Sequence, residues 1–403
     1  MKEKVQAPEL RFPGFTDDWE ERKLGELGSV AMNRRIFKDQ TSENEEVPFF
    51  KIGTFGSKPD AFISRELFEE YKLKYPYPEI GDILISASGS IGRTVVYQGE
   101  DEYFQDSNIV WLKHDNRLDN KFLKQFYSIV KWQGLEGSTI KRLYNKNILD
   151  TDISIPSTIE QNKIGMFFEQ LDNTIALHQR KLDLLKEQKK GYLQKMFPKN
   201  GAKVPELRFA GFADDWEERK LGELALVLTG FPFKNEDFVD NGKYLVITNG
   251  NIQNESSTVD VSLGNRVDDL SDEIKERYYL NKNDILVTMD GTVGRTAKVV
   301  DDNLILAQRV ARLVANKNTE FVYQWLNQGS FFNEMTKVSH GGTIKHISLN
   351  EISNYSATVP SNNIEQQKIG SFFKQLDDTI ALHQRKLDFF KEQKIGYLQK
   401  MFV

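Results

Sequence analysis

The sequence predicts an α+β protein in which two similar globular domains are separated by two long helices, packed on each other as an antiparallel intramolecular coiled coil. Three observations lead to this prediction: two segments each occur twice, one of them carries a heptad pattern, and unlike inserts of mixed pattern lie between them. We expect globular domains at residues 1–157 and 205–361, helical regions at 158–204 and 362–403, and a pseudo-two-fold axis between the halves. A length of 403 residues suits this organisation, since a domain has about 150 residues.

The duplication is read directly from the chain. Residues 8–27 return as residues 205–224 with 18 of 20 positions identical, and residues 159–197 return as residues 364–402 with 32 of 39 identical. The inserts between them share only short islands in the same order: residues 81–94 match 283–296, and residues 137–142 match 341–346. Two diverged domains of one fold explain this order better than chance similarity of loops.

The longer repeat is helical by its pattern. Apolar residues recur in steps of four and three, which is the spacing of a coiled-coil seam. At 1.5 Å per residue, its 33 residues from 164 to 196 extend about 50 Å, and neither helix can bury its stripe alone. Antiparallel pairing within the chain is favoured, and a homodimer of parallel helices is the competing arrangement. The seam residues are Ile164, Phe168, Leu171, Ile175, Leu182 and Leu185 in the first copy and Ile369, Phe373, Leu376, Ile380, Leu387 and Phe390 in the second.

Some polar and small residues in these helices receive a structural interpretation. His178 and His383 occupy matching seam positions and are interpreted as packed polar residues rather than metal ligands. Lys189 is interpreted as a solvated helix charge. Gly165 and Gly191 should weaken the helix ends by about 1 kcal/mol each relative to alanine, with a kink or fraying at Gly191.

The inserts combine strands and helices. Short β-branched runs bounded by Gly, Asn or Asp predict strands, and two patches with helical spacing predict helices. The predicted strands are residues 83–86, 109–112, 244–248, 285–288 and 310–314, and the helical patches are residues 120–132 and 320–338.

Composition excludes several classes of protein. Cysteine is absent, so disulfides, thiol nucleophiles and cysteine-ligated metal sites are excluded. No apolar run approaches the roughly 18 residues of a membrane span, and the first residues lack the apolar core of a signal peptide, so we expect a cytoplasmic protein. The net charge of −5 argues against strong binding to bulk nucleic acid by this chain alone.

Enzyme signatures are sparse. The chain has no NPPY- or DPPY-type loop for adenine methylation and no GxxxxGK[ST] phosphate loop. One short match to a PD…ExK nuclease site exists at Asp60, Glu70 and Lys72, without a counterpart in the second half. The sequence therefore favours a binding module over an enzyme.

Two glycine-containing loops follow predicted strands, SASGSIGRT and TMDGTVGRT. They can be tight turns, in which glycine supplies a positive φ. They can equally bring backbone N–H groups close to phosphate while Arg93 and Arg295 contact phosphate or guanine. Both interpretations stay open. Lys141 with Arg142, and Lys345 with His346, form cationic loop tips that suit a DNA groove or simply face solvent.

The PELRFPGF…DDWEERKLGEL segment, the GDILISASGSIGRT island and the IEQNKIGMFFEQLDNTIALHQRKLDLLKEQKKGYLQKMF helix, each present twice, resemble the specificity (S) subunit of type I restriction–modification systems. The resemblance covers essentially the whole chain. It implies that residues 1–157 and 205–361 are target recognition domains, each reading one half of a bipartite, asymmetric DNA sequence.

The resemblance also implies partners. The helical regions would separate the domains and dock two methyltransferase (M) subunits, and two restriction (R) subunits would join for cleavage of double-stranded DNA. This chain would be non-catalytic and would hold no cofactor or metal, whereas the complex would use S-adenosylmethionine, and ATP and Mg for restriction. Half-sites one helical turn apart are about 34–36 Å from centre to centre, a separation that a helix of about 50 Å can provide.

Polar and cationic loop residues are the candidate DNA contacts, because Asn and Gln pair with adenine and Arg pairs with guanine. The first-ranked candidates are Ser88, Ser90, Arg93, Lys141 and Arg142 in the first domain and Thr292, Arg295, Lys345 and His346 in the second. The second-ranked candidates are Lys51, Thr54 and Asn108, then Asn249, Asn251, Gln308 and Arg309.

Two other functions remain possible from the sequence. A duplicated coiled-coil scaffold whose inserts bind proteins predicts no sequence-selective DNA binding even with a partner. A self-contained restriction enzyme is disfavoured by the missing methyltransferase and nuclease signatures.

Overall fold

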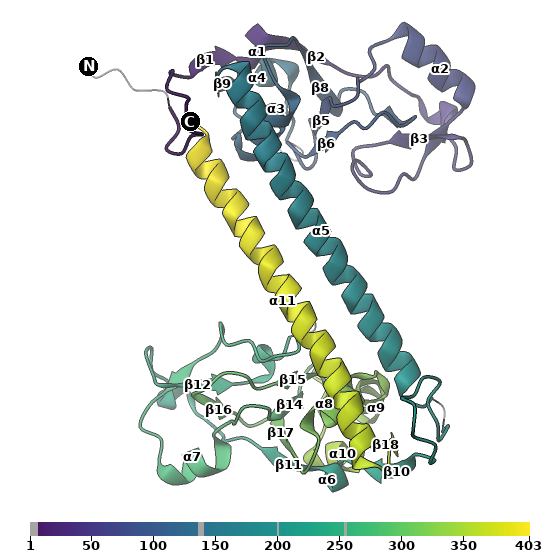
Figure 1. Ribbon diagram of the computed structural model, residues 1–403, viewed down its shortest axis with the longest axis vertical. Helices are drawn as coiled ribbons and strands as arrows, with labels where there is room; N and C mark the ends of the chain where they lie inside the picture. Colours follow the sequence, from purple (N-terminus) through teal and green to yellow (C-terminus); the bar gives the residue numbers. More distant parts are fainter. Residues whose placement is uncertain (1–6, 136–140, 200, 254–255) are drawn as a thin grey trace. The chain divides into compact units, whose positions relative to one another are not determined.

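The computed structural model describes residues 7–135, 141–199, 201–253 and 256–403. The chain divides into two compact units (Figure 1), the first made of Met1–His178 with Lys386–Val403 and the second of Gln179–Arg385. Each unit joins one globular α+β part to segments of both long helices. Residues 137–140 of the predicted island at 137–142 lie outside the described residues.

The globular part of the first unit contains three small sheets. Their strand orders are β2-β8-β5-β6, β4-β3-β7 and β1-β9. The elements are β1 (Glu20–Lys23), α1 (Leu24–Leu27), β2 (Gly28–Ala31), η1 (Lys38–Gln40), β3 (Val47–Phe50), β4 (Phe62–Ile63), α2 (Arg65–Lys74), β5 (Ile83–Ser86), β6 (Thr94–Val96), β7 (Tyr103–Phe104), β8 (Ile109–His114), α3 (Asn120–Ile129), α4 (Asn145–Leu149) and β9 (Asp152–Ile155).

The second unit repeats this topology. Its strand orders are β11-β17-β14-β15, β13-β12-β16 and β10-β18. The elements are β10 (Glu217–Lys220), α6 (Leu221–Leu224), β11 (Ala225–Thr229), η2 (Asn235–Asp237), β12 (Tyr244–Ile247), η3 (Asn249–Asn251), β13 (Arg266–Val267), α7 (Asp272–Tyr278), β14 (Ile285–Thr288), β15 (Thr296–Lys298), β16 (Leu304–Leu306), β17 (Val310–Ala315), α8 (Thr319–Asn327), α9 (Ser330–Val338), α10 (Leu349–Asn354) and β18 (Ser356–Val359).

The inner strands β5 and β14 carry the clearest sequence signal. All four residues of each strand are buried, because each strand pairs on both sides and is covered by hydrophobic side chains on both faces. A continuous apolar run is the pattern expected of such a strand. Each strand therefore fixes the position of the loop that follows it, at the end of an inner strand of the four-stranded sheet.

The two long helices are α5 (Thr158–Met196) and α11 (Asn363–Met401), each shifted by one residue from the repeated segments at 159–197 and 364–402. Helix α5 therefore ends eight residues before the end of the helical region predicted at 158–204. In the first unit, Phe167 packs on Tyr397, and the His178 ring stacks on Phe390 with centroids 5.4 Å apart. Residue numbers rise in α5 as they fall in α11, so the segments run antiparallel. The stacked His178 confirms the packed interpretation of this histidine.

Antiparallel pairing also holds within the second unit. Tyr192 packs on Phe372, and Lys189 Nζ lies 2.7 Å from Asp377 Oδ1. Both side chains of this ion pair are largely buried, so the interpretation of Lys189 as a solvated charge is wrong. A lysine at a seam position is retained because a carboxylate on the facing helix neutralises it. In the first unit, Lys394 and Asp172 form the matching pair at 2.6 Å.

The predicted seam residues fall into two groups. Ile164, Phe168, Leu182, Leu185, Ile369, Phe373 and Leu387 are buried. Leu171, Ile175, Leu376, Ile380 and Phe390 are half-buried. The seam pairs within the chain inside each unit, which is the predicted antiparallel intramolecular arrangement rather than a parallel pairing of two chains.

The kink or fraying predicted at Gly191 is wrong. Helix α5 continues through Gly191 without a break, and nothing lies within 4 Å of the place where a Cβ of residue 191 would be. Gly370 is instead a close contact: a Cβ there would lie 2.7 Å from the backbone nitrogen of Phe321 at the start of α8. Gly165 has the matching role in the first unit, where a Cβ would lie 2.6 Å from Lys121 Cβ.

We predict opposite effects for two glycine-to-alanine changes in the second unit. Gly370→Ala should lower the free energy of unfolding by about 1–3 kcal/mol, because the backbone of α8 would have to move. Gly191→Ala, the matched control, should raise it by about 0.5–1 kcal/mol through helix propensity alone. Chemical denaturation of the two variants checks this. Equal effects at both positions would contradict the close contact at Gly370.

The helical patch predicted at residues 320–338 is two helices, α8 and α9. Gly329 separates them with φ of 106°, a left-handed conformation that cannot continue an α-helix. Among the described residues, no helix combines the length and the apolar character that crossing a membrane requires.

Candidate nucleic-acid interface

A hairpin loop follows each inner strand and is braced in the same way in both units. Thr288 Oγ1, at the end of β14, donates to the Thr292 carbonyl at 2.6 Å and accepts from the Arg295 backbone N–H at 2.9 Å. Ser86 Oγ makes the equivalent bonds to Ser90 and Arg93. The glycines of both loops have φ between 66° and 82°, which confirms the tight-turn interpretation. The phosphate-binding interpretation stays a prediction.

Three polar side chains meet beside the hairpin of the first unit, and we call them the first cluster: Ser88, Asn108 and Arg142. Ser88 Oγ donates to Asn108 Oδ1 at 2.8 Å, and Arg142 Nη2 donates to the same oxygen at 3.1 Å. Arg142 Nη2 also lies 3.2 Å from Ser107 Oγ. Ser88 is buried, whereas Asn108 and Arg142 are half-buried. Three residues far apart in sequence, all predicted as DNA contacts, are therefore brought together.

A second cluster occupies the same place in the second unit and consists of Asp290, Arg309 and His346. Arg309 Nη1 donates to Asp290 Oδ2 at 2.8 Å, and His346 Nδ1 lies 3.2 Å from Asp290 Oδ1. The carboxylate is mostly covered, while the Arg309 side chain is 61% exposed. Arg309 has φ of 70°, a left-handed backbone conformation that lies in the turn immediately before β17.

The two clusters sit on one backbone arrangement. In the first unit, Ala87 donates its N–H to the Asn108 carbonyl at 2.7 Å, and its own carbonyl accepts from the Leu143 N–H at 2.8 Å. In the second unit, Met289 bonds in the same way to Arg309 at 3.2 Å and to Ile347 at 2.9 Å. Ser88 therefore corresponds to Asp290, Asn108 to Arg309, and Arg142 to His346. The backbone is shared and the side chains differ.

A loop beside the second cluster carries a lysine and two histidines. His340 and His346 exchange two backbone hydrogen bonds of 3.0 and 2.8 Å and close the loop between them. Ile344 and Lys345 are exposed on it. His340 Nδ1 lies 3.4 Å from Glu351 Oε1. Burial raises the pKa of Glu351, but hydrogen bonds from Ser348 and the two nearby imidazoles outweigh it, so this pKa lies below its ordinary value.

The remaining candidates of the first unit lie at the surface. Arg93 is exposed and donates from Nη2 to the Gly56 carbonyl at 3.3 Å. Lys51 Nζ pairs with Asp60 at 2.8 Å, and Thr54 closes a local turn with the backbone of Lys51. Ser90 and Lys141 are exposed. These residues stay predicted DNA contacts.

In the second unit, Thr292 and Gln308 are exposed, and Arg295 is half-buried with a buried Nε that meets no hydrogen-bond partner among the described residues. Asn249 Oδ1 accepts from the Met289 N–H at 3.3 Å. The prediction that Asn251 contacts DNA is wrong. It is 1% exposed, and its amide donates to the Asp260 and Leu263 carbonyls and accepts from Thr248, so it is a structural residue that cannot reach a base.

The three residues of the nuclease-like match do not form a common site. Asp60 pairs with Lys51, Glu70 with Lys74 at 2.9 Å, and Lys72 with Asp101 at 3.4 Å. Among the described residues, no group of three or more His, Asp or Glu side chains is placed to hold a metal ion.

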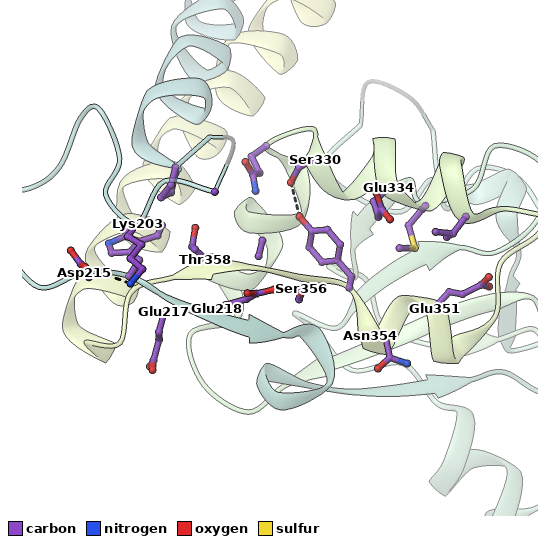
Figure 2. A pocket seen from close by; sticks show the side chains of 18 residues that line it. Lys203, Asp215, Glu217, Glu218, Ser330, Glu334, Glu351, Asn354, Ser356 and Thr358 are labelled. Carbon is purple, nitrogen blue, oxygen red and sulfur yellow. Dashed lines mark hydrogen bonds and ion pairs between the residues drawn. The ribbon is translucent and has the colours of Figure 1, made fainter.

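A cavity of the second unit lies beside β10 and β18 (Figure 2). It has a volume of about 970 Å³. The charged residues among its described lining are Lys203, Asp215, Glu217, Glu218, Glu334 and Glu351. Five carboxylates and one ammonium group would repel a phosphate backbone, so this cavity is not the nucleic-acid interface.

Sequence reasoning missed Asp290, the residue that orients two predicted contacts. A carboxylate is not a typical partner for DNA, so the search for cationic and amide groups passed over it. The signal was nevertheless present, because Asp290 holds the position in TMDGTVGRT that Ser88 holds in SASGSIGRT.

Comparisons with known proteins agree with this architecture. The model of the type I restriction modification DNA specificity domain matches the chain twice, at residues 16–187 and 213–389. A putative type I restriction enzyme specificity subunit of Haemophilus influenzae is 57% identical over 158 residues, which cover 38% of this chain and 41% of that protein. The MjaVIII specificity subunit of Methanocaldococcus jannaschii is 24% identical over 96% of this chain and 91% of its own length.

Solved structures show the same fold. The S subunit of the type I restriction–modification system from M. genitalium superposes with a TM-score of 0.67 at 15% identity, covering 98% of this chain and 99% of that one. A chain from a structure of the type I R-M system described for its complex assembly gives a TM-score of 0.51 at 14% identity, with 98% and 99% coverage.

Proposed function

The chain belongs to the type I restriction–modification DNA specificity family, and on that premise we propose that its two globular domains each read one half of a bipartite, asymmetric DNA target. The observation that carries this proposal is the pair of clusters: one backbone arrangement holds Ser, Asn and Arg in the first domain and Asp, Arg and His in the second. Such a pair suits two readers of different sequences, since hydrogen bonds to base edges specify sequence.

The chain is proposed to be a non-catalytic subunit. Two methyltransferase subunits would dock on the helical regions, and two restriction subunits would join the complex for cleavage. S-adenosylmethionine, ATP and Mg would serve those partners, because methyl transfer and cleavage are their reactions. The relatives named as specificity subunits support this division of labour. A scaffold without DNA specificity is the disfavoured alternative.

The net charge of −5 predicts how binding depends on partners. The chain alone should bind DNA weakly and lose that binding as salt rises, because few cations contact phosphate. Adding its methyltransferase subunit should give tight and selective binding, since the partner contributes phosphate contacts. Gel-shift titrations at two salt concentrations check this, with a DNA in which one half-site is scrambled as the control. A complex that binds target and scrambled DNA equally would favour the scaffold.

A further inference from the structure

The second cluster differs from the first in the hydrogen-bonding groups that remain available for a ligand. Asp290 accepts from Arg309 on one oxygen and from His346 on the other, so each carboxylate oxygen already holds one side chain of the cluster. Arg309 uses only its Nη1 to donate to Asp290. No described residue accepts a hydrogen bond from its Nε or Nη2. The guanidinium is therefore oriented by one edge while adjacent N–H donors remain available.

Available guanidinium donors match one base edge best. Guanine presents O6 and N7 as neighbouring acceptors in the major groove, and a bidentate arginine is the commonest contact that recognises them. The Arg309 side chain is 61% exposed, so these donors are accessible to a ligand.

The first cluster offers a different set of groups. Asn108 Oδ1 already accepts from Ser88 and from Arg142, which uses both lone pairs of a carbonyl oxygen. Asn108 therefore has only its amide donors available and cannot form the paired donor–acceptor contact with adenine that the sequence suggested. The corresponding positions of the two domains thus present different hydrogen-bonding groups.

Resting on the proposed function, we infer that Arg309 reads a guanine in the half-site of the second domain and that Asp290 is the positioning residue that holds its guanidinium. The residue that corresponds to Arg309 in the first domain, Asn108, contributes donors of a different geometry and so a different base preference. Specificity in the second domain is then concentrated at a cluster that joins three separate chain segments.

The test uses the purified complex of the full chain with its methyltransferase subunits, which methylates a library of randomised DNA that is then sequenced. Arg309→Ala should reduce discrimination for guanine at one position of one half-site by about 5- to 150-fold and leave the other half-site unchanged. Arg309→Lys should lose part of this discrimination while keeping the charge, because the planar fork is lost. Asp290→Asn should weaken discrimination at the same position to a smaller extent.

Arg277→Ala removes an exposed arginine of α7 that pairs with Glu273 and serves as the matched control, which should leave the recognised motif unchanged. If Arg309→Ala lowers methylation equally for every sequence, or changes no position, the inference is overturned and Arg309 positions phosphate or does nothing. If the wild-type complex itself shows no sequence preference, the proposed function fails instead, so the two failures are distinguishable.

Discussion

Glu365→Ala should lower the free energy of unfolding of the second unit by about 3–5 kcal/mol, the cost of leaving a buried charge without its partner. Glu365 lies in the first turn of α11 and is 1% exposed in its side chain. Its two oxygens accept from Arg208 Nε at 2.6 Å and Nη2 at 2.9 Å, and Trp216 Nε1 donates to it at 3.4 Å. The ion pair thereby ties the PELRF segment, which precedes β10, to the start of the long helix.

The control for this change lies on the same helix. Asp378 pairs with Lys374 at 2.7 Å on the exposed surface of α11, and Asp378→Ala should cost no more than about 1 kcal/mol. Hydrogen exchange resolved by peptide should show that the stability lost in Glu365→Ala is lost in the second unit. Glu160→Ala should cause the equivalent loss in the first unit, where Arg11 donates to Glu160 at 2.6 and 2.8 Å. A loss at Glu365 as small as that at Asp378 would contradict the account of this pair.

Arg312→Leu should destabilise the second unit by about 3–5 kcal/mol at pH 7. Arg312 Nε lies 2.7 Å from Asp284 Oδ2, both side chains are buried, and Arg312 Nη1 donates to the Tyr279 carbonyl at 2.9 Å. Burial raises the pKa of Asp284, opposed by the Asn281 N–H and by Arg312. Without the guanidinium, the pKa should rise further, and the carboxylate would be buried with no cation beside it.

The raised pKa of Asp284 determines how the stability of these variants depends on pH. A carboxyl group whose pKa is raised by folding favours the folded state below the ordinary pKa of about 4, and that contribution is lost as pH rises through the folded value. The deficit of Arg312→Leu should therefore shrink when denaturation is measured near pH 4.5 instead of pH 7. The double variant with Asp284→Asn should recover part of the loss at pH 7. An equal deficit at both pH values would show that lost packing, not the buried charge, causes it.

The long helices could be predicted nearly to the residue because their signal is periodic over 39 positions and each copy supports the other. The inner strands β5 and β14 could be predicted because a strand that is buried on both faces reads as a short, nearly continuous apolar run. Strands of two residues, such as β4 and β7, could not, because they exist only through pairing with β3. The break at Gly329 was hidden because a glycine inside a helical pattern is often tolerated.

The candidate site was predicted in part. Sequence patterns selected Ser88, Asn108 and Arg142 separately, and the fold brings them together. Sequence patterns could not predict that the Asn251 amide donates to backbone carbonyls, because these hydrogen bonds depend on where residues 260 and 263 lie. Asp290 was missed because its role depends on side chains that are 19 and 56 residues further along the chain.

Mapping methylated bases across the genome of cells with and without this gene tests the central claim most directly, which is that the chain directs modification to a bipartite DNA sequence. The account predicts a motif of two unlike specified halves around an unspecified spacer, methylated only when the gene is present. A methylation pattern that is unchanged by deletion, or a gene-dependent motif that is continuous or has two identical halves, would contradict it.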